Sequence, residues 1–411
     1  MGNKEGKIKT IAGGICAVPG FQAWGGSCGI RQNKDKKDLA LIYSETDCEA
    51  AAVYTKNEVK AAPIYVTKEH LENGKARAVV VNSGNANACA PMGKENAQKE
   101  CVALANALNI PAEDVIVAST GIIGVALPVE CIVNAIPQAV TELSAANDTA
   151  AAEAILTTDT CIKQKAVQID LDGTTVTIGA MAKGSGMIHP NMGTMLGFVG
   201  TDAVIDSALL QELLKGCTAR SFNRISVDGD TSTNDMVCVL ANGKAGGAAI
   251  KAGTESCELF REALQEVCVD LAKKIAGDGE GAGRLVTCTM VNAQTEEIAE
   301  TLAKSVISSS LVKAAMFGKD ANWGRVLCAM GYAGTVLKPE LADVYFKSKK
   351  GSVKVCENGE GLLFDEELAS AVLGEEQVEI FVDLKDGTAS ASAWGCDLTY
   401  DYVKINGDYR S

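Results

Sequence analysis

The pattern of apolar and polar positions along this chain predicts a mixture of short strands and longer helices. Strand-like alternation covers residues 8–18 and 38–56, and the run 76–81 is typical of a buried strand. Apolar residues recur at helical spacing over 93–108. Further strands are predicted at 115–119, 236–241, 284–291, 341–347, 352–356, 377–384 and 397–405, and further helices at 127–143, 146–156, 206–219, 255–276 and 295–307.

Several neighbouring strands along the chain are predicted to pair antiparallel. Residues 164–170 and 174–181 read as a hairpin, because the Asp172-Gly173 pair between them favours a tight turn. Strands and helices follow one another without a regular βαβ alternation, and neither an internal repeat nor a low-complexity linker is visible. The pattern therefore indicates an α+β fold.

Composition narrows the classes of function. The chain has 411 residues, a length that favours two to three domains. Its net charge is −14. A nucleic-acid-binding protein normally carries a basic patch, and none is visible here. The sequence contains no run of about 18 apolar residues, so it predicts no membrane-spanning helix. No secretory leader pattern is visible at the start, so we expect a cytoplasmic protein.

Cysteine and histidine usage limits the chemistry. The 15 cysteines contain no C-x-x-C pair, which favours free, mostly buried thiols in a reducing compartment. The two histidines are His70, expected at the surface, and His189, which precedes Pro190. A catalytic triad or a His-rich metal site would have to use one of these two. A nucleophile that carries its own base suits such a chain better.

Residues 183–196, K-G-S-G-M-I-H-P-N-M-G-T-M-L, contain such a candidate. Glycines free the backbone and Pro190 fixes it, so this segment can hold the Gly193–Thr194 peptide in a strained geometry. A Thr hydroxyl next to its own preceding carbonyl can cleave the chain by an N→O acyl shift. Cleavage would leave Thr194 with a free α-amine that serves as general base for its hydroxyl. From spacing alone, an ordinary Gly-rich loop remains an equal alternative.

Other polar clusters are weaker signals when taken alone. Thr120-Gly121 reads as a turn after a strand whose N–H groups can point outward. Glu280 lies among glycines that allow close approach of a ligand, although a solvated loop acid is the commoner meaning. Asp228-Gly229-Asp230 lacks the Glu that an EF-hand loop needs at its twelfth position, so we interpret it as structural.

Taken together, these segments resemble one family. K-G-S-G-M-I-H-P-N-M-G-T-M-L is similar to the self-cleaving segment of ornithine acetyltransferase, the bifunctional glutamate N-acetyltransferase of arginine biosynthesis. Seven more segments resemble that family in the same order along the chain: N-S-G-N-A-N-A-C (82–89), A-S-T-G-I-I-G (118–124), L-T-T-D-T (156–160), S-V-D-G-D-T-S-T-N-D (226–235), G-D-G-E-G-A (277–282), F-G-K-D-A-N-W-G-R (317–325) and Y-V-K-I-N-G-D-Y-R-S (402–411).

The resemblance implies a role for individual residues. Thr194 would be the nucleophile, and the scissile bond would join Gly193 to Thr194; Gly193 stands where Ala is commoner in the family. Thr120 and Gly121 would stabilise the oxyanion. The substrate would contact Thr157 (with Thr158 as an adjacent alternative), Lys183, Thr194, Glu280, Asn406 and Ser411.

The resemblance also implies a fold, an assembly and ligands. It predicts a sandwich of two β layers between α layers, similar to N-terminal-nucleophile hydrolases, cleaved into an α chain (1–193) and a β chain (194–411) that form an α2β2 assembly. The acetyl group would pass from N2-acetylornithine to Thr194 and then to glutamate. No cofactor or metal is expected, and acetyl-CoA remains open as an additional donor.

Two other functions fit parts of the sequence. An aminopeptidase or amidase of the related self-cleaving hydrolases would use the same nucleophile with water as the acceptor. A non-enzymatic binding module would need no Gly–Thr cleavage site. The number of matching segments and the C-terminal segment 402–411 favour the acetyltransferase.

Overall fold

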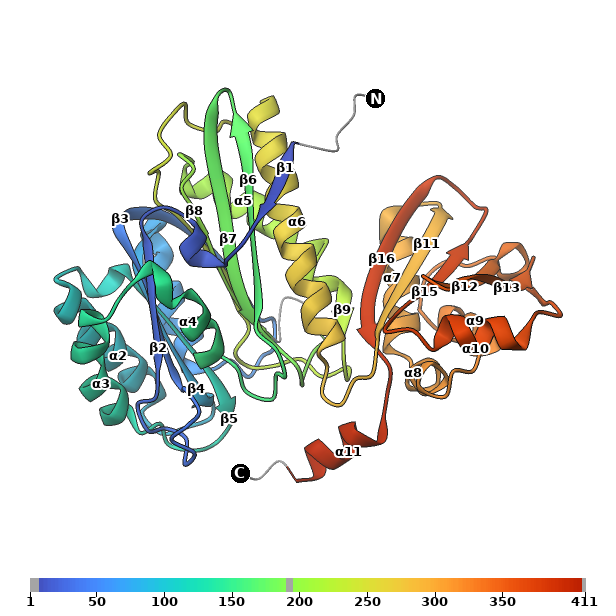
Figure 1. The fold of residues 1–411 in the computed structure, drawn as a ribbon, viewed down its shortest axis with the longest axis horizontal. Coiled ribbons are helices and arrows are strands. Elements are labelled where there is room, and N and C mark those ends of the chain that lie inside the picture. The colour runs from blue at the N-terminus through green and yellow to red at the C-terminus, as the bar shows by residue number, and fades with distance from the viewer. Residues whose placement is uncertain (1–6, 190–194, 409–411) are drawn as a thin grey trace. The chain divides into compact units, whose positions relative to one another are not determined.

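The computed structural model describes residues 7–189 and 195–408, which form two compact units. Unit 1 comprises Met1–Gly184, Asn191–Asn223 and Thr231–Leu271, and unit 2 comprises Ser185–Pro190, Arg224–Asp230 and Ala272–Ser411. Both units combine helices with a β-sheet (Figure 1). The predicted α+β class is therefore confirmed.

Unit 1 contains, among its described residues, a nine-stranded sheet with the order β1-β6-β7-β8-β10-β3-β4-β5, and β2 pairs with β3. Parallel pairs join β8 to β10 and β4 to β5. The strands are β1 (Ile8–Ile11), β2 (Phe21–Gly26), β3 (Leu39–Tyr54), β4 (Lys75–Asn85), β5 (Val115–Ile122), β6 (Lys163–Leu171), β7 (Thr174–Lys183), β8 (Leu196–Thr201) and β10 (Met236–Ala241).

The helices of unit 1 cover both faces of this sheet. They are α1 (Ala62–His70), α2 (Gly93–Leu108), α3 (Val129–Thr141), α4 (Asp148–Ala154), α5 (Ser207–Ala219) and α6 (Glu255–Gly277), whose last residues enter unit 2. Figure 1 shows α2 and α3 on one side of β3–β5. Alternate strand residues supply the two cores: Val80 packs with the α2 and α3 side, and Val79 packs with the α4 side.

Unit 2 contains a seven-stranded sheet within its described part, in the order β14-β13-β12-β15-β11-β16-β9. Its strands are β9 (Ile225–Ser226), β11 (Leu285–Ala293), β12 (Asp343–Ser348), β13 (Gly351–Glu357), β14 (Glu360–Gly361), β15 (Gln377–Asp383) and β16 (Ala389–Cys396). Its helices are α7 (Glu296–Ser308), α8 (Ser310–Phe317), α9 (Trp323–Gly331), α10 (Glu366–Leu373) and α11 (Tyr400–Gly407).

Several helices of the chain begin where a side chain caps the first turn. Asp206, Thr295 and Asp365 accept the backbone N–H three residues ahead at α5, α7 and α10. The hairpin turn is also confirmed, since Asp172 and Gly173 both adopt positive φ between β6 and β7. Within the described residues, no helix is long and apolar enough to cross a membrane.

Three expectations from the sequence are wrong. Residues 400–407 form helix α11 instead of a strand, and this helix buries none of its residues. Thr120 and Gly121 lie inside β5 instead of a turn, because pairing with β4 continues through them. His70 is buried instead of exposed, and its Nδ1 donates to the carbonyl oxygen of Val115 at 2.7 Å.

Candidate active site

Lys183, the last residue of β7, is the centre of a polar cluster in unit 1. Its side chain is mostly buried, and its Nζ donates to Thr157 Oγ1 at 2.8 Å and to Thr120 Oγ1 at 3.4 Å. Thr157 comes from the loop after α4, and Thr120 comes from the end of β5. The structure thus brings together three of the residues to which the sequence assigns a role.

Asp159 lies beneath these residues with no exposed side-chain area. Its Oδ1 accepts from Lys163 Nζ and from the Gly184 N–H, both at 2.7 Å, and its Oδ2 accepts from the Thr157 N–H at 3.1 Å. Burial alone would raise the pKa of the Asp159 carboxyl. The charges of Lys183 and Lys163 and these hydrogen bonds outweigh burial, so that its pKa lies well below its usual range.

The Thr120-Gly121 pair is held against the neighbouring strand. Gly121 has φ +136° and pairs with Gly84 of β4, and a Cβ at position 121 would lie 2.3 Å from the Gly84 carbonyl carbon. A larger residue would therefore displace the strand end that carries Thr120. The close pairing fixes the backbone at the place where the resemblance expects oxyanion donors.

Hydrogen bonds from the side chains of Asn234 and Ser83 hold the same strand ends in place. Asn234 Nδ2 donates to the carbonyl oxygens of Ala86 at 2.6 Å and Ser119 at 2.8 Å. Ser83 Oγ donates to the Ala154 carbonyl at 2.6 Å, which ties β4 to the helix that leads to Thr157. Two of the segments that resemble the family, 82–89 and 226–235, thus include residues that support the Thr120 region.

In unit 2, Glu280 and Asn406 form a separate polar pair. Asn406 Nδ2, on α11, donates to Glu280 Oε2 at 2.7 Å. The Glu280 N–H donates to the Ser185 carbonyl at 3.2 Å. A Cβ at Gly186 would lie 2.4 Å from the Glu280 carboxyl, so the backbone of Gly186 passes directly against this acid. Glu280 is mostly buried.

Asp228 holds the segment that leads toward the expected cleavage bond. Its carboxylate accepts from the Met187 N–H at 2.6 Å and from the Ile188 N–H at 2.8 Å. Met187 has φ +56°, an uncommon conformation for a residue with a side chain. Next to it, His189 Nδ1 lies 3.0 Å from Ser226 Oγ. Burial and the nearby charge of Lys304 lower the pKa of His189, so its neutral form is favoured.

Gly193, Thr194 and Ser411 lie outside the described residues. The structure places the other predicted residues in two groups: Thr120, Gly121, Thr157 and Lys183 in unit 1, and Glu280 and Asn406 in unit 2. Sequence reasoning missed the supporting acids. Asp159 is part of the L-T-T-D-T segment, and its place two residues after Thr157 was the available signal. Asp228 was interpreted only as structural.

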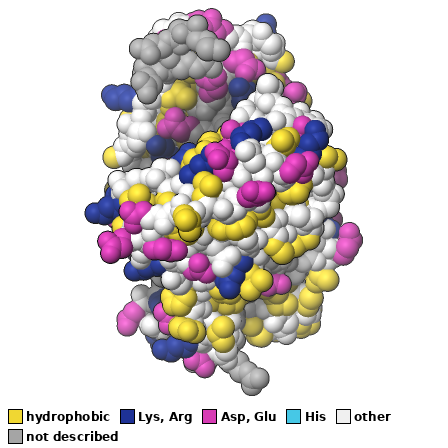
Figure 2. Space-filling model, turned by 90° about the vertical axis from the view of Figure 1, so that its right-hand side faces the viewer, with side chains coloured by type: hydrophobic (Ala, Val, Ile, Leu, Met, Phe, Trp, Pro, Cys, Tyr) yellow, Lys and Arg dark blue, Asp and Glu magenta, His cyan; other side chains and the backbone are white. Residues whose placement is uncertain are grey.

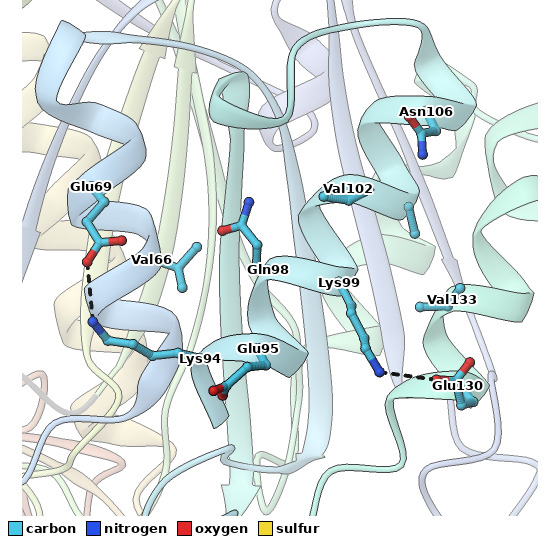
Figure 3. A pocket seen from close by; sticks show the side chains of 11 residues that line it. Val66, Glu69, Lys94, Glu95, Gln98, Lys99, Val102, Asn106, Glu130 and Val133 are labelled. Carbon is cyan, nitrogen blue, oxygen red and sulfur yellow. Dashed lines mark hydrogen bonds and ion pairs between the residues drawn. The ribbon is translucent and has the colours of Figure 1, made fainter. Parts of the chain in front are cut away.

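The surface of unit 1 also has an open groove of about 820 Å³ between α1, α2 and α3 (Figure 3). Two ion pairs join its rims, Lys94 to Glu69 at 3.3 Å and Lys99 to Glu130 at 3.6 Å. Apolar side chains such as Val66 and Val133 also line it. The groove includes none of the predicted site residues, so the Lys183 cluster remains the candidate active site.

The face of the molecule shown in Figure 2 carries acidic and basic side chains intermingled with apolar ones. Among the residues drawn in colour on that face, Lys and Arg do not gather into one large patch.

Comparison with known proteins decides the family. The model of the ArgJ family matches residues 22–411. The chain belongs to the ArgJ family. The resemblance seen in the sequence is thereby confirmed. The arginine biosynthesis bifunctional protein ArgJ of Caldanaerobacter subterraneus is 50% identical over 405 residues, which cover 98% of this chain and all of that protein. The protein of the same name from Symbiobacterium thermophilum is 52% identical over 406 residues, again 98% of this chain and all of that protein.

Solved structures of ArgJ-type proteins also match. A crystal structure of the bifunctional protein argJ from Bacillus halodurans is 45% identical with a TM-score of 0.49, and covers 52% of this chain and 99% of the solved chain. A structure of ornithine acetyltransferase complexed with ornithine from Mycobacterium tuberculosis is 39% identical with a TM-score of 0.42, and covers 45% of this chain and 98% of the solved chain.

Proposed function

We propose that this ArgJ-family chain is a glutamate N-acetyltransferase of arginine biosynthesis that takes the acetyl group from N2-acetylornithine. The observation that carries the proposal is the family match over residues 22–411, together with full-length relatives named as bifunctional arginine biosynthesis proteins. Acetyl-CoA as an additional donor is a further part of this proposal. The cycle needs no cofactor and no metal.

The cycle begins with self-cleavage between Gly193 and Thr194. The Thr194 hydroxyl attacks the Gly193 carbonyl, the acyl group moves from nitrogen to oxygen, and water hydrolyses the resulting ester. The α-amine set free then acts as general base for the Thr194 hydroxyl. We further propose that the two chains form an α2β2 assembly in the cytoplasm. Free buried thiols such as Cys48, Cys101 and Cys238 are typical of a reducing compartment.

Two acyl transfers follow. The Thr194 oxygen attacks the acetyl carbonyl of N2-acetylornithine, the C–N bond breaks, and ornithine leaves with the proton on its amine. The amine of glutamate then attacks the acetyl ester, which releases N-acetylglutamate and restores Thr194. Each tetrahedral intermediate carries an oxyanion that Thr120 and Gly121 stabilise, and removal of one such donor typically costs about 3–4 kcal/mol.

Charge matching assigns the groups of the substrate to individual residues in this proposal. Lys183, with Thr157 beside it, binds the α-carboxylate that N2-acetylornithine and glutamate share. Glu280 favours the cationic side-chain amine of ornithine, and Asn406 and Ser411 contribute contacts from the C-terminal segment. The charges of the two groups match those of an amino acid with a basic side chain.

The experiment measures N-acetylglutamate formed from N2-acetylornithine and glutamate, beside release of free acetate. In a parallel reaction without glutamate, mass spectrometry should find an acetyl group on the peptide that begins at Thr194. A Thr194→Ala protein should remain a single chain of 42.7 kDa and transfer nothing. Acetate release without N-acetylglutamate would instead favour the amidase alternative, and an active enzyme with an intact chain would contradict the cleavage.

A second assay supplies acetyl-CoA and glutamate without N2-acetylornithine. Formation of N-acetylglutamate would support the bifunctional form of the proposal. If no product forms while the first assay succeeds, this chain uses N2-acetylornithine alone.

A further inference from the structure

Three separate segments of unit 1 meet at the carboxylate of Asp159. Lys163 stands at the start of β6, Gly184 follows the end of β7, and Thr157 belongs to the loop after α4. Each of them donates one hydrogen bond to Asp159, at 2.7, 2.7 and 3.1 Å. A single buried side chain therefore ties the stretch from Thr157 to Lys163 to the end of β7, which lies 25 residues further along the chain at Gly184.

Two of these bonds act directly on the groups that are proposed to bind substrate. The Thr157 N–H bond fixes the backbone that carries the Thr157 hydroxyl, and the Gly184 N–H bond fixes the backbone that follows Lys183. The Lys183 Nζ lies 3.8 Å from Asp159 Oδ2, which is beyond hydrogen-bond length but close enough for strong attraction at a buried site. The ammonium donates to Thr157 Oγ1 instead.

We propose that Asp159 is a positioning residue, which aligns Lys183 and Thr157 as one receptor for the α-carboxylate of the substrate. The inference rests on the proposed function, and it adds a residue that determines substrate specificity. In the simpler alternative, Asp159 only compensates the buried charge of Lys163, whose side chain is also fully buried. Compensation alone would not require the two backbone hydrogen bonds.

The test compares Asp159→Asn with the wild-type enzyme on two substrates. One is N2-acetylornithine, and the other is acetylputrescine, which is the same molecule without the α-carboxylate. In the variant, KM for N2-acetylornithine should rise about tenfold, because the weaker acceptor no longer holds Lys183 and Thr157 in line with the carboxylate. The KM for acetylputrescine and the kcat for both should change little. The preference for the carboxylate, which is the ratio of kcat/KM for N2-acetylornithine to kcat/KM for acetylputrescine, should therefore fall about tenfold.

Two further variants separate positioning from folding. Asp159→Asn combined with Lys163→Met removes both buried charges, so it should restore the melting temperature but not the preference for the carboxylate. Asp202→Asn is the matched control, because Asp202 is a buried acid of unit 1 that accepts the Thr177 N–H at 2.7 Å. It should leave the preference unchanged.

The preference is also measured by calorimetry as the ratio of the dissociation constants of ornithine and putrescine, which differ in the α-carboxylate and carry no acetyl group that could be transferred to Thr194. The proposal is overturned if Asp159→Asn lowers kcat/KM or affinity equally for both ligands, or if the double variant restores the preference. Failure of the wild-type enzyme to transfer acetyl would contradict the proposed function separately, because the ratio of dissociation constants still tests the role of Asp159.

Discussion

The two groups of candidate site residues are supported in different ways. In unit 1, Lys183 stands at the end of a central strand, and the buried Asp159 and the hydroxyls of Thr157 and Thr120 surround it. In unit 2, Glu280 is held by the backbone of Ser185 and by Asn406, and the helix that carries Asn406 buries none of its residues. The basic group is therefore built into a core, while the acidic group depends on a surface helix near the chain end.

This difference suggests how the enzyme divides its tasks. The α-carboxylate is common to both proposed substrates, so a rigid receptor for it serves each half of the cycle. The basic side chain belongs to ornithine alone, and it must be accepted and released once in every turnover. A site with fewer fixed contacts suits that exchange, because local opening costs least where few residues are buried.

Thr120→Ala should give the largest effect, since in our proposal unit 1 both binds the substrate and stabilises the oxyanion. If the hydroxyl is a donor in the transition state, kcat should fall by about 10²–10³. Steady-state kinetics with N2-acetylornithine measure this. Thr120→Ser keeps the hydroxyl and is the matched control. An unchanged kcat in Thr120→Ala would remove Thr120 from the oxyanion site.

Removal of residues 406–411 tests the dependence of unit 2 on its terminal helix. The Asn406 contact to Glu280 is lost, so KM for N2-acetylornithine should rise about tenfold, while KM for glutamate should change less. Self-cleavage should continue, which two bands of about 20 and 22 kDa on a denaturing gel would show. Asn406→Ala tests the single contact. A normal KM after truncation would exclude the C-terminal segment from the site.

Asp228→Asn should slow self-cleavage without blocking it. The carboxylate fixes the Met187 and Ile188 N–H groups ahead of the expected bond, and an amide oxygen can accept only more weakly. We expect cleavage to be about three- to tenfold slower. The ratio of intact to cleaved chain over time measures it. Asp230→Asn, in the same loop, is the control, and equal slowing in both variants would contradict a specific role of Asp228.

Glu100→Gln should have the smallest effect, on stability alone. Glu100 on α2 is fully buried, neither of its carboxylate oxygens has a hydrogen-bond partner, and burial raises the pKa of its carboxyl well above the usual value. The unfolded chain loses this proton above about pH 4.3 while the folded chain retains it, so stability falls as the pH rises.

The substitution removes that pH-dependent term. The gain in melting temperature from Glu100→Gln should therefore be smallest at pH 5 and should increase toward pH 8, by up to about 1.4 kcal/mol of stability per pH unit while the folded carboxyl keeps its proton. Thermal unfolding at both pH values measures this. Glu95→Gln on the same helix is an exposed control. A gain that does not vary with pH would mean that Glu100 is ionised in the folded protein.

Long periodic elements were predictable from the sequence, and short or irregular ones were not. The helix at 93–108 and the strand at 236–241 have the predicted bounds, because several turns or a fully apolar run repeat the same signal. Helices α8, α9 and α10 have only eight or nine residues each and were missed. The segment at α11 alternates apolar and polar residues like a strand, yet no neighbouring strand pairs with it in the described structure.

In the candidate site, too, some residues could be identified from the sequence and others could not. Family motifs indicated Thr120, Thr157, Lys183, Glu280 and Asn406, and the structure brings Lys183 to Thr120 and Thr157, and Asn406 to Glu280. The supporting acids escaped notice because each has backbone N–H partners that are distant in sequence. Asp159 meets Gly184 across 25 residues, and Asp228 meets Met187 across 41. No local pattern reports such pairs.

The order of strands in the sheet of unit 1 has a consequence for what happens after cleavage. Strands β8 and β10 follow Thr194 in sequence, yet they lie in the sheet between β7 and β3, which precede it. Each fragment would thus lack neighbouring strands that only the other fragment supplies, and neither fragment could complete this sheet alone. The cleaved protein would be an obligate pair of complementing fragments. Genes that encode 1–193 and 194–411 separately should yield a folded product only when both are expressed in the same cell.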